Sequence, residues 1–142
     1  MSRSQKVIDN FNNGLNCCQC VLLAFSEELG LDKKAAIKIA SGFGGGMCHG
    51  EVCGAVTGAV MVLSLKYGNS ILDDIESKEK VYEMVREFKE KFTEINDSII
   101  CRDLLGIDLI KKENRIMARE KGLFKKCPKF VEDSINVLET ML

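Results

Sequence analysis

VYEMVREFKEKFTEI, residues 81–95, decides the fold class of this chain. Its apolar side chains recur every three or four residues, which is the spacing that places them on one face of an α-helix. The residues on this face are Val81, Val85, Phe88, Phe92 and Ile95. The opposite face is charged, as expected for a helix at the surface of a globular protein. Because no segment shows the apolar and polar alternation of a β-strand, we predict an all-α protein.

Capping residues predict where the other helices begin and end. Asn, Asp and Pro are typical of helix starts, and Gly is typical of the position just after a helix. Asp97 is expected to cap a short helix that Gly106 ends. The predicted helices cover residues 16–29, 32–40, 50–67, 81–95, 97–105, 108–120 and 128–142. We therefore expect a compact single-domain helical bundle of about six or seven helices over residues 1–142.

Charge and hydropathy exclude several classes of partner. Twenty basic and 21 acidic residues leave a net charge of −1, so the chain has no broad basic field for nucleic acid. The longest apolar run, around residues 59–65, is far too short to cross a bilayer, and the N-terminal segment lacks the apolar core of a secretory signal. We expect a cytoplasmic protein with no membrane insertion, and a homodimer is compatible with this composition.

Four of the seven cysteines fall at the predicted starts of helices. These are Cys17, Cys53, Cys101 and Cys127. A helix N-terminus offers unpaired N–H groups and a partial positive charge, both of which favour a thiolate. We therefore expect lowered pKa values at these four cysteines and a single electropositive site that they share. Thiolates attack disulfides and bind soft metals, so two kinds of chemistry follow from this pattern.

The leading hypothesis is a thiol/disulfide redox protein. In it, Cys53 is the attacking or pairing thiol, and Cys17, Cys101 or Cys127 resolves the mixed disulfide. Four cysteines allow three pairings, and the sequence does not choose among them. The chain would then be a thiol/disulfide oxidoreductase that works with a redox partner of unknown identity.

The rival hypothesis is a metal-binding module that holds zinc or an iron–sulfur cluster with the same four sulfurs. Cys48 and His49 would join such a site if their loop folds back. His49 is the chain's only histidine, so a zinc site with two cysteines and two histidines from this chain is excluded. A third hypothesis treats the cysteines as core residues of a non-catalytic helical partner protein, because free cysteine often packs as a small hydrophobe. For Cys18 and Cys20, packing is the favoured interpretation.

Gly54 and Gly58 lie four residues apart on one face of a predicted helix. Each glycine costs about 1 kcal/mol relative to alanine inside a helix, so some other gain must offset the cost. Residues without side chains let another backbone come close. We expect this helix start to be bare so that a second cysteine-bearing helix start can approach Cys53.

These motifs resemble a family of redox-active proteins that is named for its C…GCAxxG…C…C cysteine pattern. The resemblance rests on NCCQCVLLAF, ASGFGGGM, GEVCGAVTGA, CRDLLG and CPKFV, and so covers most of the chain. Residues 53–58 read Cys-Gly-Ala-x-x-Gly, with the first two residues transposed relative to the family name. The resemblance implies a redox role for the four cysteines, and an association with transporters. Cys18, Cys20 and Cys48 fall outside the four-cysteine pattern, and their role stays open.

Overall fold

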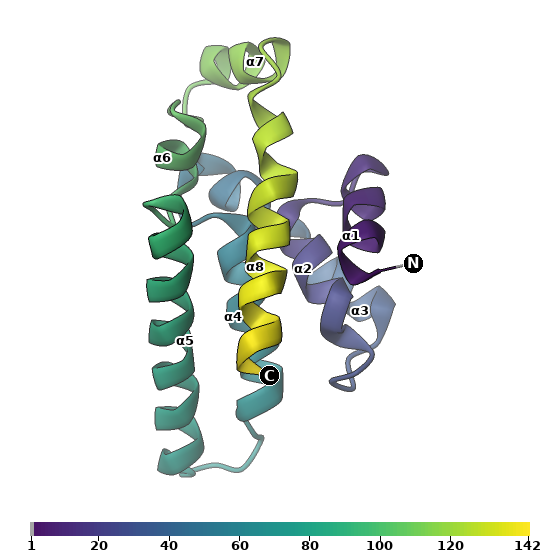
Figure 1. Ribbon diagram of the computed structural model, residues 1–142, viewed down its shortest axis with the longest axis vertical. Coiled ribbons are helices and arrows are strands. Elements are labelled where there is room, and N and C mark those ends of the chain that lie inside the picture. Colours follow the sequence, from purple (N-terminus) through teal and green to yellow (C-terminus); the bar gives the residue numbers. More distant parts are fainter. Residues whose placement is uncertain (1) are drawn as a thin grey trace.

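The computed structural model describes residues 2–142, and this part of the chain contains eight α-helices (Figure 1). They are α1 (Arg3–Asn12), α2 (Cys17–Ser26), α3 (Lys33–Ile39), α4 (Gly54–Tyr67), α5 (Ile75–Asn96), α6 (Cys101–Leu105), α7 (Lys112–Glu120) and α8 (Cys127–Met141). Three short helical turns, η1 (Ser41–Phe43), η2 (Gly46–Gly50) and η3 (Leu123–Lys126), lie between them. The prediction of an all-α bundle is confirmed.

The long helices α4, α5 and α8 pack against one another, and α2 packs against both α4 and α8. Figure 1 shows that α4 and α8 run in the same direction and that α5 runs against them. The starts of α4 and α8 therefore lie at the same end of the bundle. The largest fully buried side chains come from α2, α4, α5 and α8, and they include Phe25, Leu63, Phe88, Phe92, Ile135 and Leu138. Burying side chains of this size contributes about 1.5–3 kcal/mol each.

The helix at residues 81–95 is longer than predicted, and the stripe of apolar side chains that it buries is narrower than the predicted apolar face. Met84, Phe88 and Phe92 are buried at intervals of four residues along α5. Ile95 lies on the same side of α5, but its side chain is 51% exposed. Its predicted place in the core is therefore wrong. Asp97 ends α5 with a left-handed φ of 67°, and α6 begins only at Cys101, so the prediction that Asp97 caps this helix is also wrong.

The helix α1 is missing from the prediction because its sequence is mostly polar and buries only Val7. Its start does carry a local signal, because Ser2 and Gln5 have the spacing of a capping box. The backbone N–H of Gln5 donates to Ser2 Oγ at 3.1 Å. The helix packs against α2 and α8 and so covers one side of the bundle.

Candidate functional site

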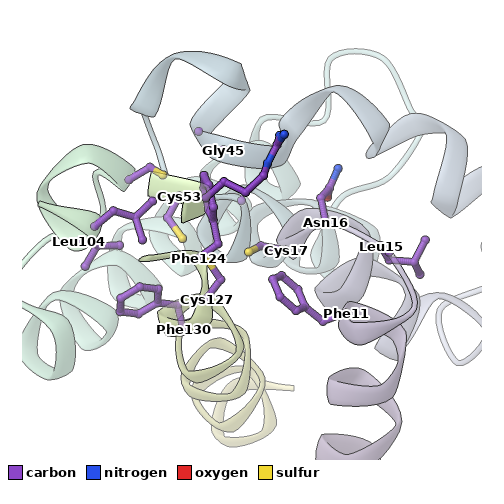
Figure 2. Close-up of a pocket in the computed structure, with 16 residues that line it drawn as sticks. Phe11, Leu15, Asn16, Cys17, Gly45, Cys53, Leu104, Phe124, Cys127 and Phe130 are labelled. Atoms are coloured by element: carbon purple, nitrogen blue, oxygen red, sulfur yellow. The ribbon is translucent and has the colours of Figure 1, made fainter. Parts of the chain in front are cut away.

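All four of the singled-out cysteines line one cavity of about 470 Å³. The cavity lies where α2, α4, α6 and α8 begin. Figure 2 shows the side chains of Cys17, Cys53 and Cys127 turned toward a common space beside Phe124. Most of the remaining lining is apolar, and its larger members are Phe11, Leu15, Leu104, Leu105, Phe124 and Phe130. The structure thus brings together cysteines that span more than a hundred residues of sequence.

A capping box holds Cys17 in place at the first position of α2. The backbone N–H of Gln19 donates to Asn16 Oδ1 at 2.9 Å, and the Asn16 N–H donates back to Gln19 Oε1 at 2.8 Å. Gln19 Nε2 also donates to the Ile37 carbonyl at 2.9 Å. The side chains of Asn16 and Gln19 are therefore fully occupied in fixing the helix start, and Cys17 follows directly on this rigid cap.

Gly54 and Gly58 let the start of α2 lie directly on α4. A Cβ at Gly54 would be 3.0 Å from the Cys18 backbone N and 3.2 Å from Cys17 Cβ. A Cβ at Gly58 would be 2.9 Å from the Cys18 carbonyl oxygen and 3.0 Å from Val21 Cβ. The contact at Gly58 is shorter than real Cβ atoms make, and those at Gly54 are tighter than usual, so glycine at both positions allows the two helices to pack this closely. The prediction that these glycines clear the way for a second cysteine-bearing helix start is confirmed.

A single antiparallel bridge between Val52 and Ile100 places Cys53 beside Cys101. The Cys53 N–H donates to the Ile99 carbonyl at 2.8 Å, and the Cys101 N–H donates to the Glu51 carbonyl at 2.6 Å. Both cysteines flank the bridge, and the alternation of side chains along a strand puts them on the same face of it. The predicted helix start at residue 50 is wrong, because residues 51–53 form this extended segment and α4 begins at Gly54.

The turn η2 makes room for this bridge. Gly46 has a φ of +62°, and a Cβ there would lie 2.5 Å from the Glu51 backbone N and 2.9 Å from Cys101 Cβ. The Glu51 N–H in turn donates to the Gly46 carbonyl at 3.0 Å. Glycine is required here both for its positive φ and for the close approach of Cys101.

Cys127 is the first residue of α8, next to Pro128. No side chain caps this helix start, in contrast to the capped start of α2. About two turns further along α8, the buried Ser134 Oγ donates to the Ala55 carbonyl at 2.8 Å, and this hydrogen bond joins α8 to the start of α4. This bond fixes the position of Cys127 relative to Cys53.

Three of the four thiols have raised pKa values, and burial is the main cause for Cys53 and Cys101. Desolvation raises the pKa of Cys101 to about 12 and that of Cys53 to about 11, although the backbone N–H groups of Ala55 and Val56 lower the latter. The pKa of Cys17 lies well above its ordinary value, because its thiol interacts with Cys127 and is deeply buried. The predicted lowering of the pKa is therefore wrong for these three, since burial, together with the Cys127 contact at Cys17, disfavours the thiolate more than a helix N-terminus favours it.

Cys127 alone among them has a lowered pKa. Its interaction with the neighbouring Cys17 thiol favours the Cys127 thiolate and outweighs the opposing effect of burial. The same contact raises the pKa of Cys17. The proton of the pair therefore stays on Cys17, and Cys127 carries the negative charge when one of the two ionises.

The other cysteines lie away from the cavity. Cys18 and Cys20 are fully buried within α2, and burial raises the pKa of Cys20 to about 12. Both pack in the core, as the sequence favoured. Cys48 and His49 are exposed in η2 and do not line the cavity, so the loop does not bring them to the four cysteines.

Two further features bear on the alternatives. Within residues 2–142, no three side chains of His, Cys, Asp or Glu converge closely enough to hold a metal ion. The four cysteines thus share a cavity without forming a ready-made tetrahedral site. Over the same residues, no helix has the length and hydropathy needed to cross a membrane.

The charged residue of the cavity, Arg119, was not anticipated, because in the sequence it is one of many basic residues on a polar helix.

A family model described as "Putative redox-active protein (C_GCAxxG_C_C)" matches residues 15–141. The chain belongs to this family. The match confirms the resemblance seen in the sequence and supports a general redox role for the protein. Neither the curated proteins nor the solved structures contain a significant match to the chain.

Proposed function

We propose that this member of the family exchanges thiols and disulfides, with Cys127 as the attacking thiolate and Cys17 as the resolving thiol. The observation that carries the proposal is that Cys17 and Cys127 line the same cavity as neighbours, where each shifts the pKa of the other. The pair replaces Cys53 as the attacking group, because a thiol with a pKa of about 11 is almost entirely protonated near neutral pH.

The reaction has two steps. The Cys127 thiolate attacks one sulfur of a substrate disulfide RSSR′, forms a mixed disulfide with it and releases R′S⁻. The sulfur of Cys17 then attacks Cys127 Sγ, its proton passes to a departing thiolate, and RS⁻ leaves. The protein loses two electrons and gains a Cys17–Cys127 disulfide, and the substrate becomes two thiols. A cellular dithiol reductant closes the cycle by the reverse exchange.

Cys53 and Cys101 support this chemistry by staying neutral. Both have raised pKa values and line the same cavity as the reacting pair. A second thiolate nearby would raise the pKa of Cys127 through charge repulsion. As protonated thiols, they are polarisable neighbours of the Cys17–Cys127 pair and carry no negative charge that would repel the Cys127 thiolate.

The test is mass mapping of the protein after reaction with limiting disulfide. We expect a Cys17–Cys127 bridge in the native sequence, a mixed disulfide trapped on Cys127 in Cys17→Ser, and loss of the fast reaction in Cys127→Ser. Cys18→Ser is the matched control, because Cys18 is a buried neighbour in α2 that does not line the cavity. A bridge between other cysteines, or thiols that react no faster than free cysteine, would overturn the proposal.

The metal-binding hypothesis predicts a different result from the same preparation. Stoichiometric zinc or iron in anaerobically purified protein, together with thiols that become reactive only after chelation, would replace redox exchange by metal binding. If serine at all four positions changes only stability, the cysteines are core residues of a helical partner protein.

A further inference from the structure

The cavity contains one charged side chain, and it belongs to Arg119 in the last turn of α7. Gly122, with a φ of +69°, ends this helix and turns the chain into η3, which leads directly to Cys127. Figure 1 shows α7 lying across the end of the bundle where α8 begins. The fold therefore brings Arg119 to the cavity that holds the cysteine pair.

Arg119 has no structural partner within residues 2–142. Its side chain is exposed, and no hydrogen bond or ion pair to another described residue uses its guanidinium. A basic residue one turn earlier behaves differently, because Arg115 Nη1 donates to the carbonyls of Leu109 and Ile110 at 2.8 and 2.7 Å. Arg119 thus keeps its hydrogen-bond donors free, whereas Arg115 holds the loop before α7.

The other polar side chain of the lining cannot serve a ligand in the same way. Asn16 Oδ1 accepts from the Gln19 N–H, and Asn16 Nδ2 donates to the carbonyls of Ala40 and Ser41 at 3.3 and 3.1 Å. Apart from the thiols, the guanidinium of Arg119 is therefore the side chain left to bind a polar group. A guanidinium matches a carboxylate, because it can donate two parallel hydrogen bonds.

The size and lining of the cavity restrict the rest of the ligand. A volume of about 470 Å³ lies within the range of small-molecule sites, roughly 300–1,000 Å³. Phe11, Phe124 and Phe130 make much of the wall apolar and aromatic. A cation is also needed for an acidic substrate, because the Cys127 thiolate repels any other anion that enters.

We infer that the cavity binds a low-molecular-weight disulfide with an apolar body and a carboxylate, and that Arg119 holds the carboxylate while Cys127 attacks the sulfur. The inference rests on the proposed thiol/disulfide exchange. The exchange step is the one given above: the S–S bond of the ligand breaks, a bond to Cys127 forms, and the departing half leaves as a thiolate. Arg119 takes no part in bond changes and determines which disulfides react fast.

The experiment compares two disulfide reagents on the same protein, dithiobis(nitrobenzoate), whose aromatic halves each carry a carboxylate, and neutral dithiodipyridine. Cys48→Ser serves as the background, because Cys48 is exposed and would react on its own. Arg119→Gln removes the cation, and Lys121→Gln makes the same charge change at a nearby residue that does not line the cavity. Stopped-flow absorbance gives the second-order rate constant for each combination of protein variant and disulfide reagent.

Arg119→Gln should lower the rate constant for the anionic reagent by roughly three- to tenfold and leave that for the neutral reagent unchanged. Lys121→Gln should leave both unchanged. Added salt should slow the anionic reaction of the background protein more than that of Arg119→Gln. If Arg119→Gln slows both reagents equally, or neither, Arg119 does not recognise the carboxylate, although the exchange proposal stands. If neither reagent reacts faster than with free cysteine, the proposed function itself fails.

Discussion

Replacing Gly58 by alanine tests how closely α2 and α4 approach each other. The added methyl group would lie 2.9 Å from the Cys18 carbonyl oxygen and 3.0 Å from Val21 Cβ, whereas ordinary contacts begin at 3.4 Å. Neither atom sits at the end of a flexible side chain, so α2 itself must move. Because Cys17 precedes Cys18 in the same helix turn, this movement also changes the position of Cys17 relative to Cys127.

The expected loss of stability is the difference between two opposing effects. Alanine gains about 1 kcal/mol of helix propensity over glycine. Overpacking of this kind costs about 1–3 kcal/mol, and the short contacts with backbone atoms place Gly58 near the upper end of that range. We expect a net destabilisation of about 1–2 kcal/mol, which corresponds to a fall in Tm of about 3–8 °C for a chain of this length.

Urea denaturation followed by circular dichroism measures this change, and Gly42→Ala is the control. Gly42 lies exposed in η1, its φ is outside the left-handed region, and no atom lies within 4 Å of a Cβ added there. Its substitution should alter stability by less than about 0.5 kcal/mol. Equal stability of Gly58→Ala and Gly42→Ala, with an unchanged rate of Cys17–Cys127 bridge formation, would refute the close contact and the role of the glycine.

Two further predictions concern the buried thiols. Five thiols have raised pKa values and one has a lowered value, so the folded chain holds more protons than the unfolded chain once the pH exceeds about 8.5, the pKa of a free thiol. The stability that the raised-pKa thiols contribute should therefore be fully present below that pH, and it should fall between there and pH 11 by about 1.4 kcal/mol per pH unit for each of these thiols. Cys20→Val should make the free energy of unfolding, measured by urea denaturation, fall less steeply with pH. An identical pH dependence in both proteins would contradict the raised pKa of Cys20. Cys20→Ala should also cost about 1–2 kcal/mol at neutral pH because it leaves a core cavity, whereas Cys48→Ala at an exposed position should change stability by less than about 0.5 kcal/mol, and the opposite order of these costs would contradict their burial.

Much of the fold follows from local signals in the sequence. Asn16, Asp32 and Pro128 begin helices where they were expected to, because caps act through backbone groups within a few residues. The glycine pair in α4 also predicted a close helix contact correctly. Ile95 was misassigned because helical periodicity does not show which part of an apolar face a neighbouring helix covers. Asp97 was misassigned because Asp is also tolerated in the left-handed conformation that ends a helix, as it is at the end of α5.

The pKa shifts and roles of the site cysteines were harder to predict than which cysteines form the site. The positions of four cysteines at helix starts indicated a shared site, but the direction of each pKa shift depends on burial, which only the packed structure gives. The distinction between Cys53 and Cys127 arises from a contact between helices α2 and α8. Arg119 gave no local signal, because its importance depends on how Gly122 redirects the chain.

The pairing of α2 with α8 at the cavity has a consequence for the whole chain. A covalent link between Cys17 and Cys127 would enclose about three quarters of the polypeptide in one ring. In the chain-entropy model, a ring of about 100 residues restricts the denatured ensemble by about 4–5 kcal/mol. The oxidised protein would then outlast its reduced form under heat or protease. Redox state and lifetime would be linked through a single bond.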